Sequence, residues 1–321
     1  MKKRMQTALA ATLLALGIGG AQAQDYPSRP ITIVVPFAAG SGTDQMARVM
    51  GQAISQEYKV TVLVDPKPGA SGFIASQFVA KAPADGYTVL MTSNTTHAAN
   101  QHLYKKLPYD PVKDFSPVAL LSKGHMALLV NPASPIKTVG DLLAEAKRRP
   151  GKLSFGSGSS SSRVAGELLQ QMSGIEVLHV PYKSNPFAIT DLLGGQIDFM
   201  FADTSTAVPQ INGGKLRALG VSGTKRLTSL PNIPTVDEAG VKGYDMSYWS
   251  AVYLPPNTPP AVVKKLNEMF AKAASAPGVQ SLLATTSSSP SHSTPEGLAT
   301  FQAEESLKWG RVIKAAGIQP E

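Results

Sequence analysis

The chain passes from an apolar run into a glycine-rich turn at Ile31-Thr32-Ile33-Val34-Val35-Pro36-Phe37-Ala38-Ala39-Gly40-Ser41-Gly42-Thr43-Asp44. The run Ile31–Val35 predicts a buried strand, and Gln45–Ile54 predicts a helix after the turn. We expect Thr43 or Asp44 to cap that helix. Because the first amides of a helix lack partners and its dipole favours negative charge, the turn is a candidate anion site. The alternative is a plain connection between a strand and a helix.

The alternation of strand-like and helical segments continues along the chain. Repeated units of this kind predict an α/β fold, in which parallel strands are covered by helices on both faces. Ligands of such sheets bind at the carboxyl ends of the strands. The segments that follow the first pair are Val60–Val64, Gly72–Ala80, Thr88–Thr92, Met126–Val130, Val139–Lys147, Ser154–Gly156, Arg163–Met172, Val177–Val180, Ala188–Leu193, Ile197–Phe201, Val208–Asn212 and Ala218–Val221.

A second polar turn resembles the first and indicates a fold of two lobes. It contains Ser159, Ser160 and Ser161, whose hydroxyl groups can donate hydrogen bonds to a carboxylate. A flexible linker is the alternative, but an apolar strand and an amphipathic helix flank the turn and favour an ordered one. After Trp249 a strand and a helix return to the first lobe. We expect a mixed, mainly parallel sheet in each lobe, with residues 24–125 and 249–321 in lobe 1 and residues 126–248 in lobe 2.

The N-terminal residues have the pattern of a secretory signal peptide. Lys2, Lys3 and Arg4 precede the apolar stretch Ala8–Ile18, and Ala21-Gln22-Ala23 matches the site that a signal peptidase cleaves. We expect residues 1–23 to be removed. The apolar stretch is shorter than the ~20 residues that a membrane helix needs, so we expect an exported protein that does not itself span the membrane. Its charge would be about +5, from +8 minus the three positive residues of the leader.

Composition and motifs exclude several kinds of site. The chain has no cysteine, which rules out thiol catalysis, thiolate metal sites and disulfides. Five histidines are scattered, and His97 and His102 miss the i,i+4 spacing of a helical metal site. No G-x-S-x-G motif occurs, and no basic stripe with interleaved aromatic residues indicates nucleic-acid binding. We therefore expect no catalytic residue, no metal and no cofactor.

The order of short motifs resembles the Bug family of extracytoplasmic solute receptors, the binding proteins of tripartite tricarboxylate transporters. The resemblance covers essentially the whole length after the leader. Besides the first turn, the motifs that carry it are Tyr26-Pro27-Ser28-Arg29-Pro30, Lys67-Pro68-Gly69-Ala70-Ser71-Gly72, Ala84-Asp85-Gly86-Tyr87-Thr88, Leu107-Pro108-Tyr109-Asp110-Pro111-Val112-Lys113-Asp114-Phe115, His179-Val180-Pro181-Tyr182-Lys183, Asp191-Leu192-Leu193-Gly194-Gly195-Gln196-Ile197-Asp198, Gly214-Lys215-Leu216-Arg217-Ala218-Leu219 and Pro234-Thr235-Val236-Asp237-Glu238-Ala239-Gly240.

This resemblance implies a periplasmic receptor of the Venus-flytrap kind, which closes on a small carboxylate and passes it to a permease of one large and one small membrane subunit. It also implies that the first turn holds one carboxylate and that the loop after the third strand lines the same cleft. The residues concerned are Phe37, Ala38, Ala39, Gly40 and Thr43 in the turn, and Ser93, Thr95 and His97 in the loop.

Three positions depart from the usual family pattern and bear on the ligand. Arg163 stands where a histidine is common, and its guanidinium could hold a second carboxylate, unless it points to solvent. Ser184 replaces a glycine, and Asp203 comes one place later than the usual acid. Tyr182 and Trp249, like Phe37 and Tyr248, could stack on a flat ligand or simply pack in the core.

Together these features predict a receptor for a small mono- or dicarboxylate, with an aromatic diacid such as terephthalate favoured. An arginine opposite an amide turn, with aromatic rings between them, suits a rigid flat diacid. Aliphatic dicarboxylates and tricarboxylates such as citrate are alternative ligands. Two other functions stay open: a sensor subunit for a membrane kinase, and a secreted enzyme that acts on a small acid.

Overall fold

One continuous path of strands connects the two halves of the computed structural model, which describes residues 26–321. The expected signal peptide, residues 1–23, lies outside these residues. The strand order is β2-β1-β3-β9-β4-β7-β5-β6, and β8 and β10 also pair with β4. The strands are β1 (Ile31–Val35), β2 (Val62–Pro66), β3 (Thr88–Ser93), β4 (Ser116–Val130), β5 (Ser154–Ser157), β6 (Leu178–Pro181), β7 (Phe199–Asp203), β8 (Arg217–Val221), β9 (Ser247–Leu254) and β10 (Ser289–Pro290).

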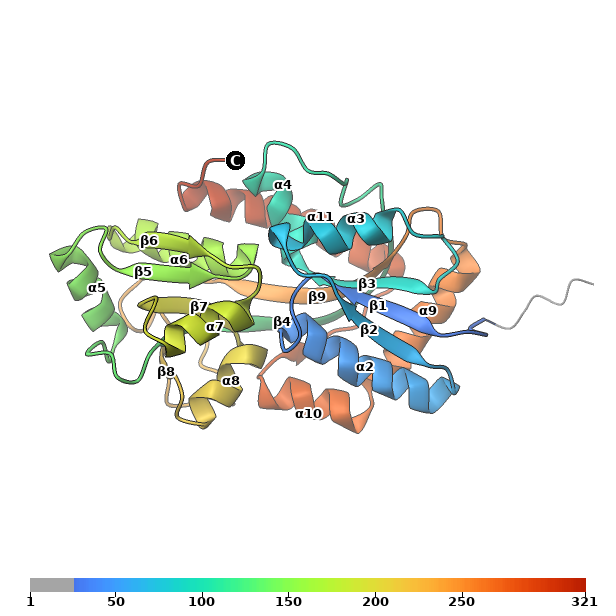
Figure 1. Ribbon diagram of the computed structural model, residues 1–321, viewed down its shortest axis with the longest axis horizontal. Coiled ribbons are helices and arrows are strands. Elements are labelled where there is room, and N and C mark those ends of the chain that lie inside the picture. Colours follow the sequence, from blue (N-terminus) through green and yellow to red (C-terminus); the bar gives the residue numbers. More distant parts are fainter. Residues whose placement is uncertain (1–25) are drawn as a thin grey trace, which may run out of the picture.

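Helices cover both faces of this path, as Figure 1 shows, with the first half of the molecule to the right and the second half to the left. The helices of the first half are α2 (Gly42–Tyr58), α3 (Phe73–Ala80), α4 (Asn100–Leu103), α9 (Pro260–Ala274), α10 (Pro277–Thr285) and α11 (Pro295–Ala315), with the short turns η1 (Ala70–Gly72) and η2 (Thr95–Ala99). Those of the second half are α5 (Val139–Arg148), α6 (Ser160–Ser173), α7 (Asn185–Leu193) and α8 (Thr204–Asn212).

The long strand β4 belongs to both halves. It pairs with β9 through Ser116–His125 and with β7 through Met126–Val130. Pairs that involve β4 or β9 are antiparallel, whereas β1 pairs in parallel with β2 and β3, and β5 pairs in parallel with β6 and β7. The fold is thus the mixed α/β arrangement that the sequence predicts. The division into two separately moving lobes stays a prediction, because a shared strand fixes topology and not motion.

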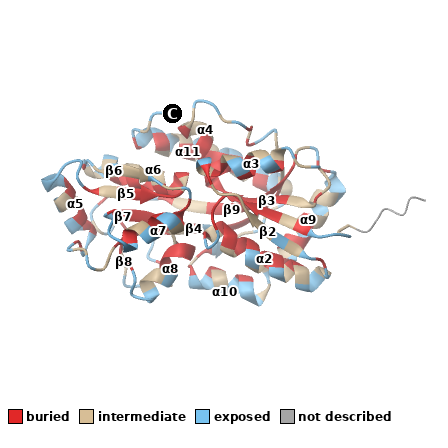
Figure 2. Cartoon of the chain, in the orientation of Figure 1, coloured by how far each residue is buried: buried red, intermediate tan, exposed pale blue. Residues whose placement is uncertain are grey.

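The hydrophobic core lies in layers on the two faces of the sheet (Figure 2). On one face of the first half, alternate residues of β1 pack against α2, α9 and α10. On the other face, residues of α3 and α11 join those of α6 in one cluster that continues under the second half. A third cluster packs α7 and α8 on the opposite face of the second half. The period-2 alternation of the strands places successive side chains in different layers.

The structure corrects one local prediction and adds elements that the sequence patterns missed. Helix α2 begins at Gly42 and is capped by Ser41, whose hydroxyl accepts a hydrogen bond from the amide of Asp44. Thr43 or Asp44 as the cap was therefore wrong, because both lie inside the first turn. Strand β4 begins ten residues earlier than the expected segment at Met126. The buried turn η2 and the helix α10 have no counterpart among the expected segments.

Candidate functional site

A cavity lies between the two halves, and we call it the first cavity. It contains about 680 Å³ of empty space, part of it open to solvent. Seven of the candidate residues from the sequence line it: Phe37, Thr43, Ser93, Ser159, Ser161, Asp203 and Trp249. The other lining residues were not among those candidates: Ser41, Gly42, Met46, Ser122, Met126, Gly158, Ser184, Asn185, Ser205, Tyr248, Ser250, Leu282, Thr286 and Ser288.

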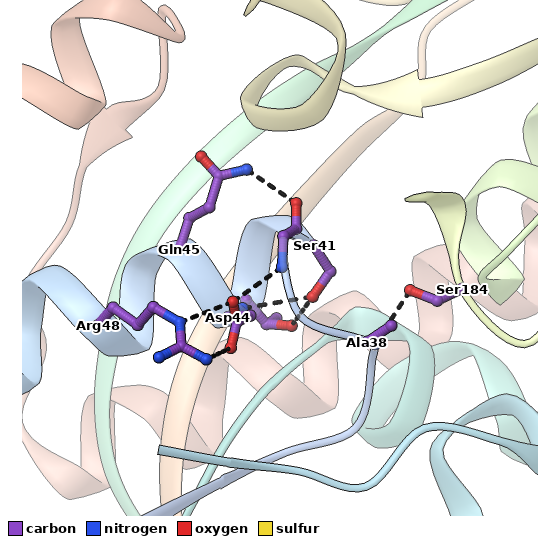
Figure 3. A network of polar contacts seen from close by, with 8 residues as sticks. Ala38, Ser41, Asp44, Gln45, Arg48 and Ser184 are labelled. Carbon is purple, nitrogen blue, oxygen red and sulfur yellow. Dashed lines mark hydrogen bonds and ion pairs between the residues drawn. The ribbon is translucent and has the colours of Figure 1, made fainter. Parts of the chain in front are cut away.

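At the start of α2, two backbone amides beside this cavity have no hydrogen-bond acceptor in the described residues. The amide of Gly40 donates to Oδ2 of Asp44 at 2.8 Å, and the amide of Ala38 donates to Oγ of Ser184 at 3.2 Å (Figure 3). These two amides are thus already used within the protein. Gly42 and Thr43 line the cavity, and their amides have no hydrogen-bond acceptor among residues 26–321. We infer that an anion at this end would be met by Gly42 and Thr43 rather than by Gly40.

The first turn of α6 faces the cavity from the second half. Ser159 caps the helix in a reciprocal capping box with Ser162. The hydroxyl of Ser161 accepts a hydrogen bond from Nδ2 of Asn94 at 2.8 Å and contacts Oγ1 of Thr95. Since Asn94 follows β3 in the first half, this contact crosses between the halves. The serine run is therefore an ordered turn at the cavity wall and not a flexible linker.

Two further helix N-termini, those of α7 and α8, complete the cavity wall. Ser184 and Asn185 start α7, and Asp203 caps α8 with its Oδ1 accepting from the amide of Thr206 at 3.0 Å. Oδ2 of Asp203 accepts from Nδ2 of Asn185, also at 3.0 Å. Four helix dipoles thus point their positive ends at one space. In the sequence, the small polar residues that directly follow the strands are the signal that could have indicated the starts of α7 and α8 as part of the site.

The close approach of these helix ends depends on two glycines. A Cβ at Gly42 would overlap the hydroxyl of Ser205 and lie 2.8 Å from Oδ1 of Asp203. A Cβ at Gly158 would overlap the backbone between Ser184 and Asn185. A side chain at Gly42 would therefore press against the second half, whereas one at Gly158 would separate the starts of α6 and α7 within the second half.

Charge and aromatic groups define the rest of the first cavity. Among the described residues, its lining contains no lysine, arginine or histidine, and Asp203 is its one carboxylate. Tyr248 lies over Gly124 with its hydroxyl 3.3 Å from that of Ser288, and burial raises the pKa of this phenol. Trp249 is buried, and its Nε1 donates to Oε2 of Glu305 at 3.1 Å. Backbone dipoles and hydroxyl groups, not cationic side chains, would have to hold an anion here.

Arg163 lies in a different space, which we call the second cavity. It encloses about 540 Å³ of empty space, partly open to solvent, and shares only Gly158 and Ser159 with the first. Nη2 of Arg163 lies 2.7 Å from Oε1 of Glu321. Ser161 and Arg163 are two residues apart in α6, about 200° around the helix, so they face different ways. The structure therefore does not bring Arg163 to the first cavity.

Ser160 and Tyr182 also line the second cavity, together with His179. Ser160 lies three residues before Arg163, on the same face of α6, and its hydroxyl donates to Oδ1 of Asn100 at 2.7 Å. Tyr182 donates to Oδ2 of Asp191 at 2.7 Å. Burial, with the charge of Arg163, lowers the pKa of His179 to about 4. Ser160 and Tyr182, both candidates from the sequence, thus line the second cavity together with Arg163 and do not line the first.

The remaining candidates line neither cavity. Ala38, Ala39 and Gly40 form the turn behind Gly42. Thr95 supports Ser161, and His97 is buried against Tyr253, with ring centroids 3.9 Å apart. Burial lowers the pKa of His97 to about 3, so its ring is neutral. Within residues 26–321, no cluster of three or more His, Cys, Asp or Glu could hold a metal ion, and no helix is long and apolar enough to cross a membrane.

Comparisons with known proteins show what the whole chain is similar to. Residues 46–318 match the tripartite tricarboxylate transporter family receptor. The solved structure of R. palustris Rpa4515 with adipate is 34% identical, with a TM-score of 0.89, over 92% of this chain and 100% of that one. The periplasmic binding protein BugD is 32% identical, with a TM-score of 0.88 over the same shares. MatC (Rpa3494) from Rhodopseudomonas palustris, with bound malate, is 29% identical, with a TM-score of 0.84, over 90% of this chain and 100% of that one.

Proposed function

This chain belongs to the tripartite tricarboxylate transporter receptor family, and on that premise we propose that it captures a small organic carboxylate in its first cavity and delivers it to a membrane permease. The resemblance drawn from the sequence motifs is thus confirmed at the level of the family. The family is one of periplasmic solute-binding receptors, and this favours a receptor over an enzyme.

The observation that carries the proposal is the convergence of the first turns of α2, α6, α7 and α8 on one cavity. Free amides at Gly42 and Thr43 supply hydrogen bonds, and the helix dipoles supply positive potential without a cationic side chain. Such a site suits an anion that must be released again, because no full opposite charge has to be separated from it on opening. The structures with adipate and malate make diacids of four and six carbons the first aliphatic acids to test.

An aromatic dicarboxylate such as terephthalate stays our first candidate within this class. Phe37, Tyr248 and Trp249 line the cavity, and an aromatic ring there could pack against a flat ligand. Because Arg163 faces the second cavity, the second carboxylate would have to be held by the amides and hydroxyls of α6 and α8. Aliphatic diacids, which need no ring contact, are the direct competitors.

A thermal-shift screen over mono-, di- and tricarboxylates, followed by calorimetric titration, tests the proposal. A ligand at 100 times its dissociation constant adds about 2.7 kcal/mol to the free energy of unfolding. We expect at least one small carboxylate to do so and to be recovered chemically unchanged after incubation. No stabilisation by any acid would contradict the proposal, and consumption of the acid would favour the enzyme alternative.

Delivery needs a separate experiment. The two permease subunits, reconstituted in vesicles, should take up the labelled acid only when this receptor is present on the outside. Uptake at the same rate without the receptor would contradict delivery and would leave the sensor role as the better explanation of binding.

A further inference from the structure

A buried carboxylate lies at the positive end of α2, next to the amides proposed to hold the ligand. The side chain of Asp44 is 2% exposed, and its Oδ2 accepts the amide of Gly40 at 2.8 Å. Arg48, one turn further along α2, holds the same carboxylate with both ends of its guanidinium, from Nε to Oδ2 at 3.0 Å and from Nη2 to Oδ1 at 2.9 Å (Figure 3). Arg48 itself does not line the first cavity.

Asp44 poses an electrostatic problem for an anion site. It follows Thr43 directly, so a carboxylate held by the Thr43 amide lies within about one helical turn of the Asp44 carboxylate. Two negative charges at such a short distance repel each other. The first cavity already contains the carboxylate of Asp203, for which the part of the chain that the structure describes provides hydrogen bonds but no ion pair.

The bidentate pair with Arg48 removes most of this repulsion. A guanidinium that binds both carboxylate oxygens places its charge within 3.0 Å of them and fixes the plane of the carboxylate. Asp44 can then accept the Gly40 amide and fix the shape of the turn while adding little negative potential to the cavity. The side chain of Arg48 is half-exposed and that of Asp44 is buried, so salt screens this attraction less than it does in a pair with both groups exposed.

We propose that Arg48 sets the affinity of the first cavity for anions, without touching the ligand, by neutralising Asp44. Arg48 is thus a positioning residue for the proposed function, on which this inference rests. The competing explanation is that the pair only stabilises α2, as an i,i+4 pair does in an isolated helix. The two explanations differ in how the effect depends on the charge of the ligand.

The test compares two ligands of nearly equal shape and different charge, adipate and its half-amide, or the tightest diacid of the screen and its half-amide. In Arg48→Gln, the charge of Asp44 is uncompensated, so we expect about tenfold weaker binding of the half-amide and a clearly larger loss for the diacid. Added salt should reduce the difference. Arg48→Lys, which keeps the charge, should lose much less.

The double variant Asp44→Asn with Arg48→Gln separates charge from structure. It removes both charges, while the carboxamide oxygen introduced at position 44 keeps an acceptor for the amide of Gly40. We therefore expect binding to return to within about threefold of the unaltered protein. Arg148→Gln is the matched control, because Arg148 holds Glu145 in the same bidentate way on α5, away from both cavities. That variant should bind both acids normally.

Equal losses for both acids in Arg48→Gln, or no recovery in the double variant, would overturn the inference and leave a purely structural pair. If Arg48→Gln does not fold, the affinities of the two acids are compared in Arg48→Lys and in the double variant instead. Failure of the unaltered protein to bind any acid is a different result, which would overturn the proposed function itself.

Discussion

Nη2 of Arg163 lies 2.7 Å from Oε1 of Glu321, so the first turn of α6 is joined to the segment that follows α11. The backbone of Glu321 is in turn hydrogen-bonded to Leu103 and Lys105 around the end of α4. Arg163 is therefore held by a carboxylate of the protein itself, in the second cavity. This contact replaces the ligand carboxylate that the sequence pattern predicted for Arg163.

Arg163→Ala should weaken mono- and dicarboxylates by similar, small factors. Glu321 is half-exposed, and such a pair contributes no more than about 1 kcal/mol to the free energy of unfolding. Calorimetric titration with a diacid and its half-amide measures this directly. A loss confined to the diacid would return Arg163 to the ligand site.

Gly42→Ala should weaken ligand binding while leaving the fold intact. Gly42 has ordinary helical backbone angles, but a methyl group there would meet Ser205 and Asp203 of the other half. We expect at least a roughly tenfold rise in the dissociation constant, which costs about 1.4 kcal/mol of binding free energy, and a larger radius of gyration by small-angle scattering.

Gly140→Ala is the control for that substitution. Gly140 also lies in the first turn of a helix, but its nearest neighbour would be Oγ1 of Thr138 at 3.6 Å, an ordinary contact. Unchanged ligand affinity in Gly42→Ala would show that the two halves need not approach as closely as they do here.

Ser161→Ala should lower ligand affinity more than Ser160→Ala does. Both hydroxyls bond across the halves, Ser161 to Asn94 and Ser160 to Asn100, and each loss leaves a buried group unpaired at a cost of about 1–3 kcal/mol in unfolding. Only Ser161 lines the first cavity. Urea denaturation and titration of both variants test the difference, and equal effects on ligand affinity would argue against a ligand contact by Ser161.

The neutral, buried His97 should make the fold less stable at mildly acidic pH. Burial lowers its pKa from 6.5 to about 3 in the folded state, so below pH 6.5 the unfolded chain gains this proton first. Stability therefore falls as the pH falls from 6.5 towards 3, by roughly 2 kcal/mol at pH 5. In His97→Phe, which keeps a ring against Tyr253, the free energy of unfolding from urea titrations should change less between pH 7 and pH 5. The same slope in both proteins would contradict this assignment.

Local sequence patterns were sufficient for the strand Ile31–Val35, for the turn and helix that follow it and for the alternation of elements. Those features depend on neighbouring residues: apolar runs form strands, and a serine before a helical segment supplies a cap. The same logic misplaced that cap by two or three residues, because Ser41, Thr43 and Asp44 are all good capping residues and only the backbone angles distinguish them.

The serine run shows where local pattern stops being informative. Whether a residue of α6 faces the first or the second cavity depends on where the helix starts, since each residue turns by about 100°. Because α6 starts at Ser160, Ser161 lines the first cavity, whereas Ser160 and Arg163 line the second. A shift of one residue in the cap would have changed that assignment.

By itself, the sequence determined that two polar turns would each present a helix N-terminus, because capping and strand signals lie within a few residues. The order of its short motifs indicated the family. The tertiary structure alone decided that α7, α8 and α10 share the first cavity, that Ser184 accepts the amide of Ala38, and that Glu321 pairs with Arg163. Those contacts join residues far apart in the chain, up to 158 positions for the last pair by subtraction of its numbers, and only packing of the two halves brings them together.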